Sequence, residues 1–197
     1  MLNDISTPLS LLETRRSGKA REMIAPGPTE TQLEQILRIA ARSPDHGKLA
    51  PWRFVIVDED QRDALALLLR RALAANDPCA GPAHNAKADE FAHQGEALVV
   101  LVSAPVENHK IPVWEQQLSC GAVAMNLLHA ATTLGFVGSW LTGWYAYDPM
   151  VRGGFCTGNE RITGFFFLGS PSLSLVERPR PELVDVARRW TEPADQI

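Results

Sequence analysis

Apolar residues recur at a helical period in two stretches of the N-terminal half of the chain. The first stretch follows Thr29, and Gln32 three residues later predicts a capping box at the start of a helix. This helix is expected to end near Arg42, because Pro44 disfavours a helical conformation in the residue before it. The second stretch begins at Asp60. The pattern therefore predicts two amphipathic helices in this half of the chain.

Continuous apolar runs predict buried strands elsewhere. They cover residues 52–57, 97–104, 136–140 and 162–168. Between the second and third runs, residues 114–134 carry apolar or small side chains nearly all round, which predicts a helix buried on most of its sides. Helices and strands thus alternate along the chain, without internal repeats.

The more polar segments are expected outside the core. Residues 76–94 hold two prolines and predict a loop with a short helix. Residues 172–197 are rich in proline and charge, which predicts an extended arm attached to a single domain that spans residues 1–197. Arg178 and Arg180 fall on this arm and could reach a phosphate, but solvation is the expected state of their side chains.

Composition narrows the class of protein. A chain of 197 residues with 45% hydrophobic content is long enough for one packed domain. Its 19 basic and 23 acidic residues give a net charge of −4, which argues against nucleic acid as the main partner. No apolar run approaches the roughly 20 residues that cross a bilayer, and the first residues lack the pattern of a secretory signal. We therefore expect a cytoplasmic protein that binds neither nucleic acid nor a membrane.

Several familiar chemistries find no support in the sequence. The cysteines, Cys79, Cys120 and Cys156, are widely spaced and form no C-x-x-C pair, so reduced thiols are expected. The five histidines show no metal-ligand spacing, and no metal site is predicted. Glycine-rich phosphate loops, zinc-protease motifs and serine-hydrolase motifs do not occur. Without obvious catalytic side chains, the chain fits a protein whose bound cofactor carries the chemistry.

Two polar clusters remain as candidates for that cofactor. The sequence R-R-S-G-K at residues 15–19 follows a short predicted helix at residues 10–13. The sequence R-S-P-D-H-G-K-L-A-P-W-R-F occupies residues 42–54, between a predicted helix and a predicted strand. Arginine offers forked donors and serine adds a hydroxyl, so these groups suit a phosphate. Taken alone, the first cluster fits the solvated end of a helix better than it fits a phosphate site.

Together with three further segments, these clusters resemble the FMN-dependent nitroreductase family in its compact NAD(P)H type. The segments are E-N-H-K-I-P-V-W-E-Q at residues 107–116, G-F-V-G-S-W-L-T-G at residues 135–143 and G-F-F-F-L-G-S-P at residues 164–171. The likeness covers about residues 9–181. Several motifs in the family's order indicate the family far more specifically than any single motif does.

The resemblance implies an α+β fold with a mainly antiparallel central sheet wrapped by helices. It also implies a homodimer with FMN in each of two clefts at the subunit interface. By this resemblance, Arg15, Arg16 and Ser17 hold the phosphate and ribityl end of FMN, and Lys19 approaches the flavin ring. The resemblance thus predicts that the first cluster binds the cofactor.

The remaining contacts implied by the resemblance lie elsewhere in the chain. Arg42 and His46 would reach FMN from the other subunit, and Trp140, Leu141 and Thr142 would line it. A second set of residues at the end of the long helix is implied as the contact for NAD(P)H. This set is Ala130, Ala131, Thr132, Thr133, Leu134 and Gly135.

The activity implied by the resemblance is hydride transfer from NAD(P)H to an electron-poor acceptor, such as a nitroaromatic or a quinone, by a ping-pong mechanism. No catalytic side chain is expected, because the flavin carries the chemistry, although Lys19, Arg42 or Lys48 could stabilise negative charge on it. Two departures from the family pattern leave a non-catalytic flavin-binding or sensing protein as an alternative. Leu141 replaces an arginine, and Lys48 and Ala50 replace asparagine and glutamine. Reductive dehalogenation and flavin-consuming ring cleavage also remain open.

Overall fold

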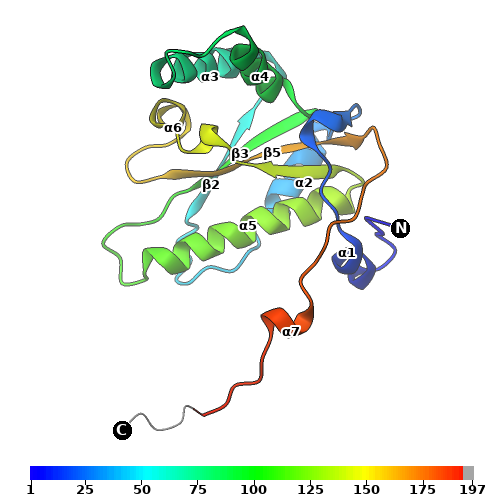
Figure 1. Ribbon diagram of the computed structural model, residues 1–197. Coiled ribbons are helices and arrows are strands. Elements are labelled where there is room, and N and C mark those ends of the chain that lie inside the picture. Colours follow the sequence, from blue (N-terminus) through cyan, green and yellow to red (C-terminus); the bar gives the residue numbers. More distant parts are fainter. Residues whose placement is uncertain (193–197) are drawn as a thin grey trace.

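The computed structural model of the chain describes residues 1–192, in which a sheet carries helices on both faces (Figure 1). The strands are β1 (Met23–Ile24), β2 (Trp52–Val57), β3 (Ala97–Ser103), β4 (Val137–Leu141) and β5 (Arg161–Pro171). The helices are α1 (Pro8–Thr14), α2 (Glu30–Ala40), α3 (Arg62–Asn76), α4 (Pro82–His93), α5 (Val113–Thr133), α6 (Pro149–Phe155) and α7 (Leu183–Val186). Short 3-10 turns are η1 (Ala20–Glu22), η2 (Glu59–Gln61) and η3 (Trp144–Ala146).

Within residues 1–192, the strands form one antiparallel sheet in the order β1-β5-β3-β2, with β4 also paired to β5. β5 is the longest strand and lies between β3 on one side and β4 and β1 on the other. β2 pairs with β3 and forms an edge of the sheet. This arrangement confirms the predicted α+β class with a mainly antiparallel sheet.

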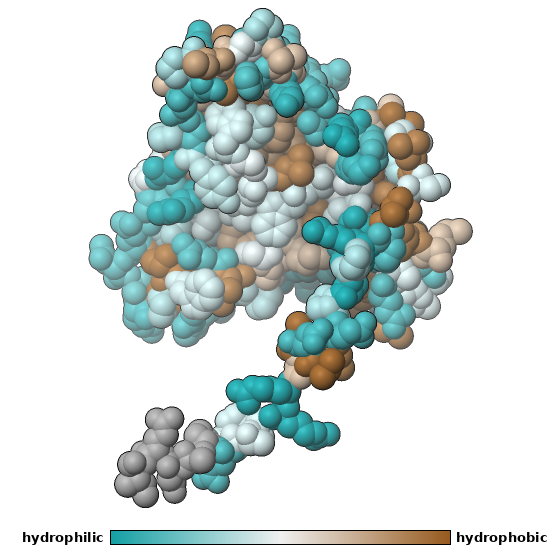
Figure 2. Space-filling view, in the orientation of Figure 1, coloured by the Kyte–Doolittle hydropathy of each residue, from teal (hydrophilic) through white to brown (hydrophobic). Residues whose placement is uncertain are grey.

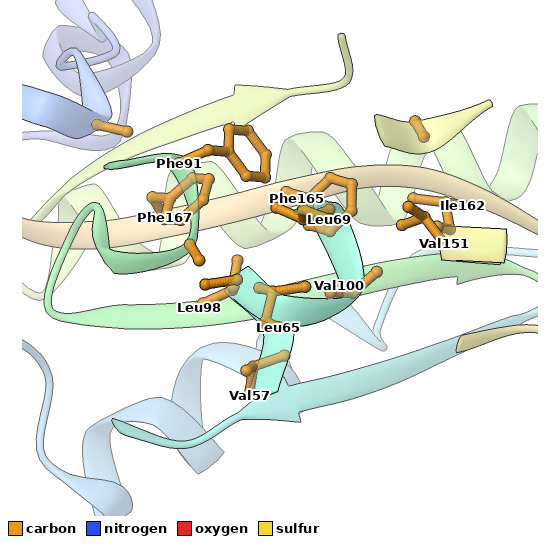
Figure 3. Close-up of a cluster of buried hydrophobic side chains, with 14 of the residues drawn as sticks. Val57, Leu65, Leu69, Phe91, Leu98, Val100, Val151, Ile162, Phe165 and Phe167 are labelled. Atoms are coloured by element: carbon orange, nitrogen blue, oxygen red, sulfur yellow. The ribbon is translucent and has the colours of Figure 1, made fainter. Parts of the chain in front are cut away.

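The sheet separates two hydrophobic cores because successive side chains of a strand point to opposite faces. Phe165 and Phe167 of β5 face α3 and α4, where the ring of Phe91 meets both edge-on with centroids 5.2 Å apart (Figure 3). Phe166 and Leu168 face the opposite way, toward α2 and α5. A strand that is buried on both faces needs apolar residues at every position, which explains the continuous apolar run in the sequence. Each fully buried phenylalanine contributes about 1.5–3 kcal/mol.

The helix after Thr29 begins as the sequence predicts. The Thr29 N–H donates to Gln32 Oε1 at 2.9 Å, and the Gln32 N–H donates to Thr29 Oγ1 at 3.3 Å. These reciprocal hydrogen bonds form the predicted capping box and satisfy two otherwise unpaired donors at the helix start. The helix ends at Ala40, four residues before Pro44.

The prediction of a loop with a short helix over residues 76–94 is wrong in its main part. α4 covers twelve residues of this segment and begins with Pro82 at a position where proline is well tolerated. Phe91 buries itself in the core, and the buried guanidinium of Arg62 donates to the carbonyl oxygens of Ala92 at 2.8 Å and of Gln94 at 3.1 Å. Packing and this buried arginine therefore stabilise a helix that its polar local sequence does not predict.

Two predictions of burial are only partly correct. Val57 is buried in β2, but Ile56 is 43% exposed, because β2 is an edge strand. The long helix predicted at residues 114–134 is α5, and its inner face is buried against the sheet. Its outer face leaves Trp114 and Leu118 exposed at 67% and 53%. A single chain therefore leaves apolar surface uncovered on α5.

An ion pair ties the edge strand β2 to the turn before β5. The Arg53 guanidinium donates from Nε to Glu160 Oε1 at 2.8 Å and from Nη2 to the other carboxylate oxygen. The Thr157 N–H donates to the same carboxylate at 2.7 Å. The hydrogen bonds from Arg53 are the main reason that the pKa of Glu160 falls from its ordinary value of 4.5 to about 2.

Glu160→Gln is expected to lower the free energy of unfolding by about 1 kcal/mol at pH 7, the upper range for an ion pair that water still reaches. A carboxyl group whose pKa is lower in the folded state stabilises the fold fully above its unfolded value. The stabilisation disappears as the pH falls from about 4.5 toward 2. Urea unfolding of both proteins at several pH values should show curves that converge in acid. Glu13→Gln, at an exposed position of α1, is the control, and equal stabilities at pH 7 would contradict the prediction.

Candidate functional site

The basic cluster at residues 15–19 lies directly after α1. Thr7 caps that helix by accepting a hydrogen bond from the Ser10 N–H at 3.0 Å. Beyond the helix, Arg15 Nη1 donates to Ser17 Oγ at 3.3 Å, so two of the predicted phosphate ligands lie side by side. A Cβ atom on Gly18 would lie 2.8 Å from a methyl carbon of Val137. Glycine at this position therefore allows the cluster to pass close to β4.

The tail beyond β5 folds back onto the same cluster. Arg16 Nε donates to the Val176 carbonyl oxygen at 2.8 Å, and the Ser172 N–H donates to the Glu22 carbonyl oxygen at 3.0 Å. Leu175 packs against the core. Residues 172–180 therefore run back along the body of the protein, with Leu175 half-buried and the other side chains exposed. Farther on, α7 stands away from the body and exposes hydrophobic residues (Figures 1 and 2).

Arg180 is brought close to Arg15 by this fold of the tail. Burial, followed by the positive charges of Arg180 and Arg16, lowers the pKa of Arg15. The sequence allowed Arg180 to reach a phosphate but did not predict its proximity to Arg15, because about 160 residues separate the tail from the first cluster. The prediction that residues 172–197 are an arm on a single domain remains a prediction, and residues 193–197 of it lie outside the described residues.

Two adjoining cavities border the basic cluster. The first, of about 520 Å³, lies between residues 16–19 and tail residues 173–179. The second, of about 500 Å³, shares Gly18 and Lys19 with the first and extends to β4, α4 and η3. We call the two together the recess. Its size is that of a small-molecule site.

The two ends of the recess differ in chemistry. The first cavity is bordered by Arg16 and Ser17. The second is bordered by Phe91 and Tyr145, whose rings stack with centroids 4.0 Å apart, and by Leu141, together with the charged residues Arg21, Lys87 and Glu90. Lys19 lies where the cavities meet, and its Nζ is 2.7 Å from Glu22 Oε1. The recess therefore has a cationic end and an aromatic end.

The end of β4 supplies one wall of the recess. Ser139 and Leu141 line the second cavity, whereas the side chain of Trp140, between them, lies on the other face of the sheet. Trp140 Nε1 donates to the Thr163 carbonyl oxygen at 3.0 Å, and a Cβ atom on Gly164 would collide with the indole. The ring of Trp140 therefore faces away from the recess, and its backbone is the part that lies nearer to the recess. Half-buried Thr142 follows β4 directly.

The loop that carries the second cluster is organised by Asp45. Its carboxylate accepts hydrogen bonds from the backbone N–H groups of Leu49 at 2.8 Å and Ala50 at 3.0 Å. Lys48 and Ala50 have positive φ angles of 58° and 47°, which residues other than glycine and asparagine seldom adopt. The bonds to Asp45 hold this conformation. An aspartate after a proline is a turn signal, and could have pointed to this role.

Within one chain, His46 of the second cluster lies far from Arg15 of the first. His46 Nδ1 lies 2.7 Å from Glu115 Oε2 in the first turn of α5, and Arg42 is exposed. Arg15, in contrast, lies near His129, whose pKa is lowered by burial and then by the Arg15 charge. Glu115 and His129 are about 20 Å apart at 1.5 Å per helical residue. His46 therefore cannot join Arg15 at one phosphate within a single chain.

The segment implied for NAD(P)H runs through the end of α5. Ala130, Ala131 and Thr132 are buried, and Thr132 Oγ1 donates to the Leu128 carbonyl oxygen at 2.9 Å. The residues that reach the surface are Thr133, Leu134 and Gly135. Contact between this segment and a dinucleotide remains a prediction.

Membrane spanning and metal binding find no support in the part of the chain that the structure describes. None of its helices combines the length and the apolar character that a bilayer requires. In residues 1–192, no group of three or more histidine, cysteine, aspartate or glutamate side chains is arranged around a possible metal ion.

Comparison with known proteins identifies the family. The model of the nitroreductase family matches residues 12–170. The chain belongs to the nitroreductase family. The match runs from α1 to the end of β5 and so includes both clusters and the end of β4. The predicted family is thereby confirmed.

Curated relatives and solved structures agree with this membership. The Escherichia coli (strain K12) protein named "Putative NAD(P)H nitroreductase YdjA" is 36% identical over 169 residues, which are 84% of this chain and 88% of that protein. A nitroreductase-like protein from Bacillus cereus superposes with a TM-score of 0.79 at 18% identity, over 93% of this chain and 96% of that one. A nitroreductase from Exiguobacterium sibiricum, solved in complex with FMN, superposes with a TM-score of 0.70 at 14% identity, over 93% and 97%. These structures show that the fold is shared.

Proposed function

We propose that this chain is an FMN-dependent oxidoreductase that passes a hydride from NAD(P)H to an electron-poor acceptor, such as a nitroaromatic or a quinone, by a ping-pong mechanism. The observation that carries the proposal is the recess, in which a cationic end continues into an aromatic end. Two relatives support it by name, since one is called an NAD(P)H nitroreductase and another was solved with FMN.

The cationic end fits the phosphate of FMN. Arg16 and Ser17 line this end, Arg15 lies behind them with the Ser17 hydroxyl beside it, and the charges of Arg180 and Arg16 oppose that of Arg15. Such crowding of like charges is unfavourable by itself and is relieved by an anion. Arginine and serine donors together suit the oxygens of a phosphate dianion. These residues would hold the phosphate and orient the rest of the cofactor along the recess.

The aromatic end fits a flat ring system. Phe91, Tyr145 and Leu141 offer apolar surface there, and Lys19 places a positive charge at the junction. When bound, FMN supplies the capacity to accept a hydride and donate it again. The surrounding side chains exclude water and provide position and charge, so no acid or base from the protein is required. A single recess also suits a ping-pong mechanism, in which donor and acceptor use the same space in turn.

A homodimer forms part of this proposal. Trp114, Leu118 and Trp140 leave apolar surface exposed on the α5 side of the sheet, which is typical of a protein–protein contact. His46 points to the same arrangement, because it lies too far from Arg15 to contact the same phosphate within a chain. A second chain would supply His46 across the interface, together with Arg42 by the family resemblance.

Anaerobic reduction tests the proposed activity. The purified protein, saturated with FMN, is expected to lose its visible flavin absorbance on addition of NADH or NADPH, and to regain it when a nitroaromatic or a quinone is added. Initial rates at varied donor and acceptor concentrations should give parallel double-reciprocal lines. A protein that binds FMN and responds to neither donor would instead be a non-catalytic flavin-binding protein. Failure to bind FMN would refute the proposal altogether.

A further inference from the structure

Two carboxylates line the cationic end of the recess, and of these Glu22 pairs with Lys19 whereas Glu177 lies among the arginines. Glu177 lines the cavity formed with the tail and directly follows Val176, whose carbonyl oxygen accepts the hydrogen bond from Arg16. Glu177 Oε1 accepts hydrogen bonds from the Arg178 N–H at 2.7 Å and from Arg180 Nη2 at 3.2 Å. The tail thus delivers an anion together with Arg180.

This carboxylate interacts with the cations proposed for the phosphate. The hydrogen bond from the Arg178 N–H, followed by the charges of Arg180 and Arg16, lowers the pKa of Glu177. In turn, Glu177 partly offsets the effect of Arg180 and Arg16 on the pKa of Arg15. Glu177 is therefore ionised at neutral pH and interacts electrostatically with all three arginines.

We infer that Glu177 is an internal counter-anion that competes with the phosphate of the cofactor for Arg15, Arg16 and Arg180. The inference rests on the proposed function, because it assumes that a phosphate binds at this end. A phosphate dianion beside a carboxylate is opposed by like-charge repulsion. Glu177 must therefore either turn away from the phosphate or weaken the binding of the phosphate. Because half of its side chain is exposed, at 52%, it can turn toward water without opening the core.

The inference predicts that Glu177→Gln tightens FMN binding. In flavin-free, full-length protein, we expect the dissociation constant for FMN to fall about three- to tenfold at low ionic strength, measured by flavin fluorescence. The gain should shrink in about 1 M salt, where the screening length is about 3 Å. Riboflavin, which lacks the phosphate, should bind both proteins equally. Glu177→Asp, which keeps the charge, should resemble the wild type.

Glu182→Gln is the matched control, because Glu182 lies on the same tail and its side chain does not cap α7. It should leave FMN affinity unchanged. If Glu177→Gln binds FMN no more tightly than the wild type, or binds it more weakly, the inference is wrong and Glu177 serves instead to position Arg180. If neither protein binds FMN, the proposed function is refuted, and the inference that rests on it is refuted as well. The two failures are therefore distinguishable.

Discussion

Arg15→Ala is expected to weaken FMN binding about 10- to 100-fold while leaving the fold intact. The Arg15 guanidinium is partly buried beside Ser17 and near Arg180, where a charge-assisted hydrogen bond to phosphate is worth about 1.5–3 kcal/mol. Its removal also relieves repulsion among the arginines, so the fold loses little. Fluorescence titration with FMN and thermal unfolding of the flavin-free protein measure the two effects separately.

Arg38→Ala is the control for this variant. Arg38 is exposed on α2 and pairs only with Glu34 on the same helix among the described residues, at 3.2 Å. Loss of that surface pair should change neither FMN affinity nor stability appreciably. The variants should also bind riboflavin alike. An Arg15→Ala protein that is purified with its full complement of yellow flavin would show that Arg15 does not hold the phosphate.

Mixing two inactive variants is expected to restore one cofactor site per dimer. If each site combines Arg15 of one chain with Arg42 of the other, Arg15→Ala and Arg42→Ala should each impair both sites of its own homodimer. In the mixed dimer, one site regains both arginines and the other loses both. Purified heterodimers carrying two different affinity tags should therefore bind about half the FMN of the wild type at a concentration that leaves either homodimer nearly empty.

The control for the mixture is Arg15→Ala paired with the double variant Arg15→Ala, Arg42→Ala. That heterodimer contains no intact Arg15, so neither of its sites should recover. If the first mixture also fails to recover, Arg42 either acts within its own chain or does not contact FMN. Such a result would refute the shared site, although FMN binding to the wild type would still stand.

The sequence predicted the elements that are determined by a local capping pattern or by a continuous apolar run. The capping box at Thr29 and the apolar runs of β3 and β5 depend on neighbours in the chain or on burial from both sides, and these elements appear where expected. α4 was missed because its stability comes from Phe91 in the core and from Arg62, contacts that no local pattern displays. The exposed positions of β2 were missed for a related reason, since the place of a strand within a sheet depends on pairings distant in the sequence.

For the candidate site, the sequence located the first cluster, and the structure supplied its surroundings. The family resemblance drew attention to residues 15–19 and to Leu141, and residues 16–19 and Leu141 line one recess. It gave no sign that Glu177 lies near Arg15 and Arg16, and Arg180 was expected to be solvated. Those contacts exist because the tail beyond β5 is held by hydrogen bonds to Arg16 and to the carbonyl oxygen of Glu22.

The amino-acid sequence by itself determined the residue types available for a phosphate and, through the order of its motifs, a resemblance that implied the family and the α+β class. Only the tertiary structure decided which charged side chains lie close enough to interact, because electrostatic interaction depends on distance in space rather than along the chain. The fold of the tail brings Arg180 close to Arg15, whereas His46 lies at the far end of α5 beside Glu115.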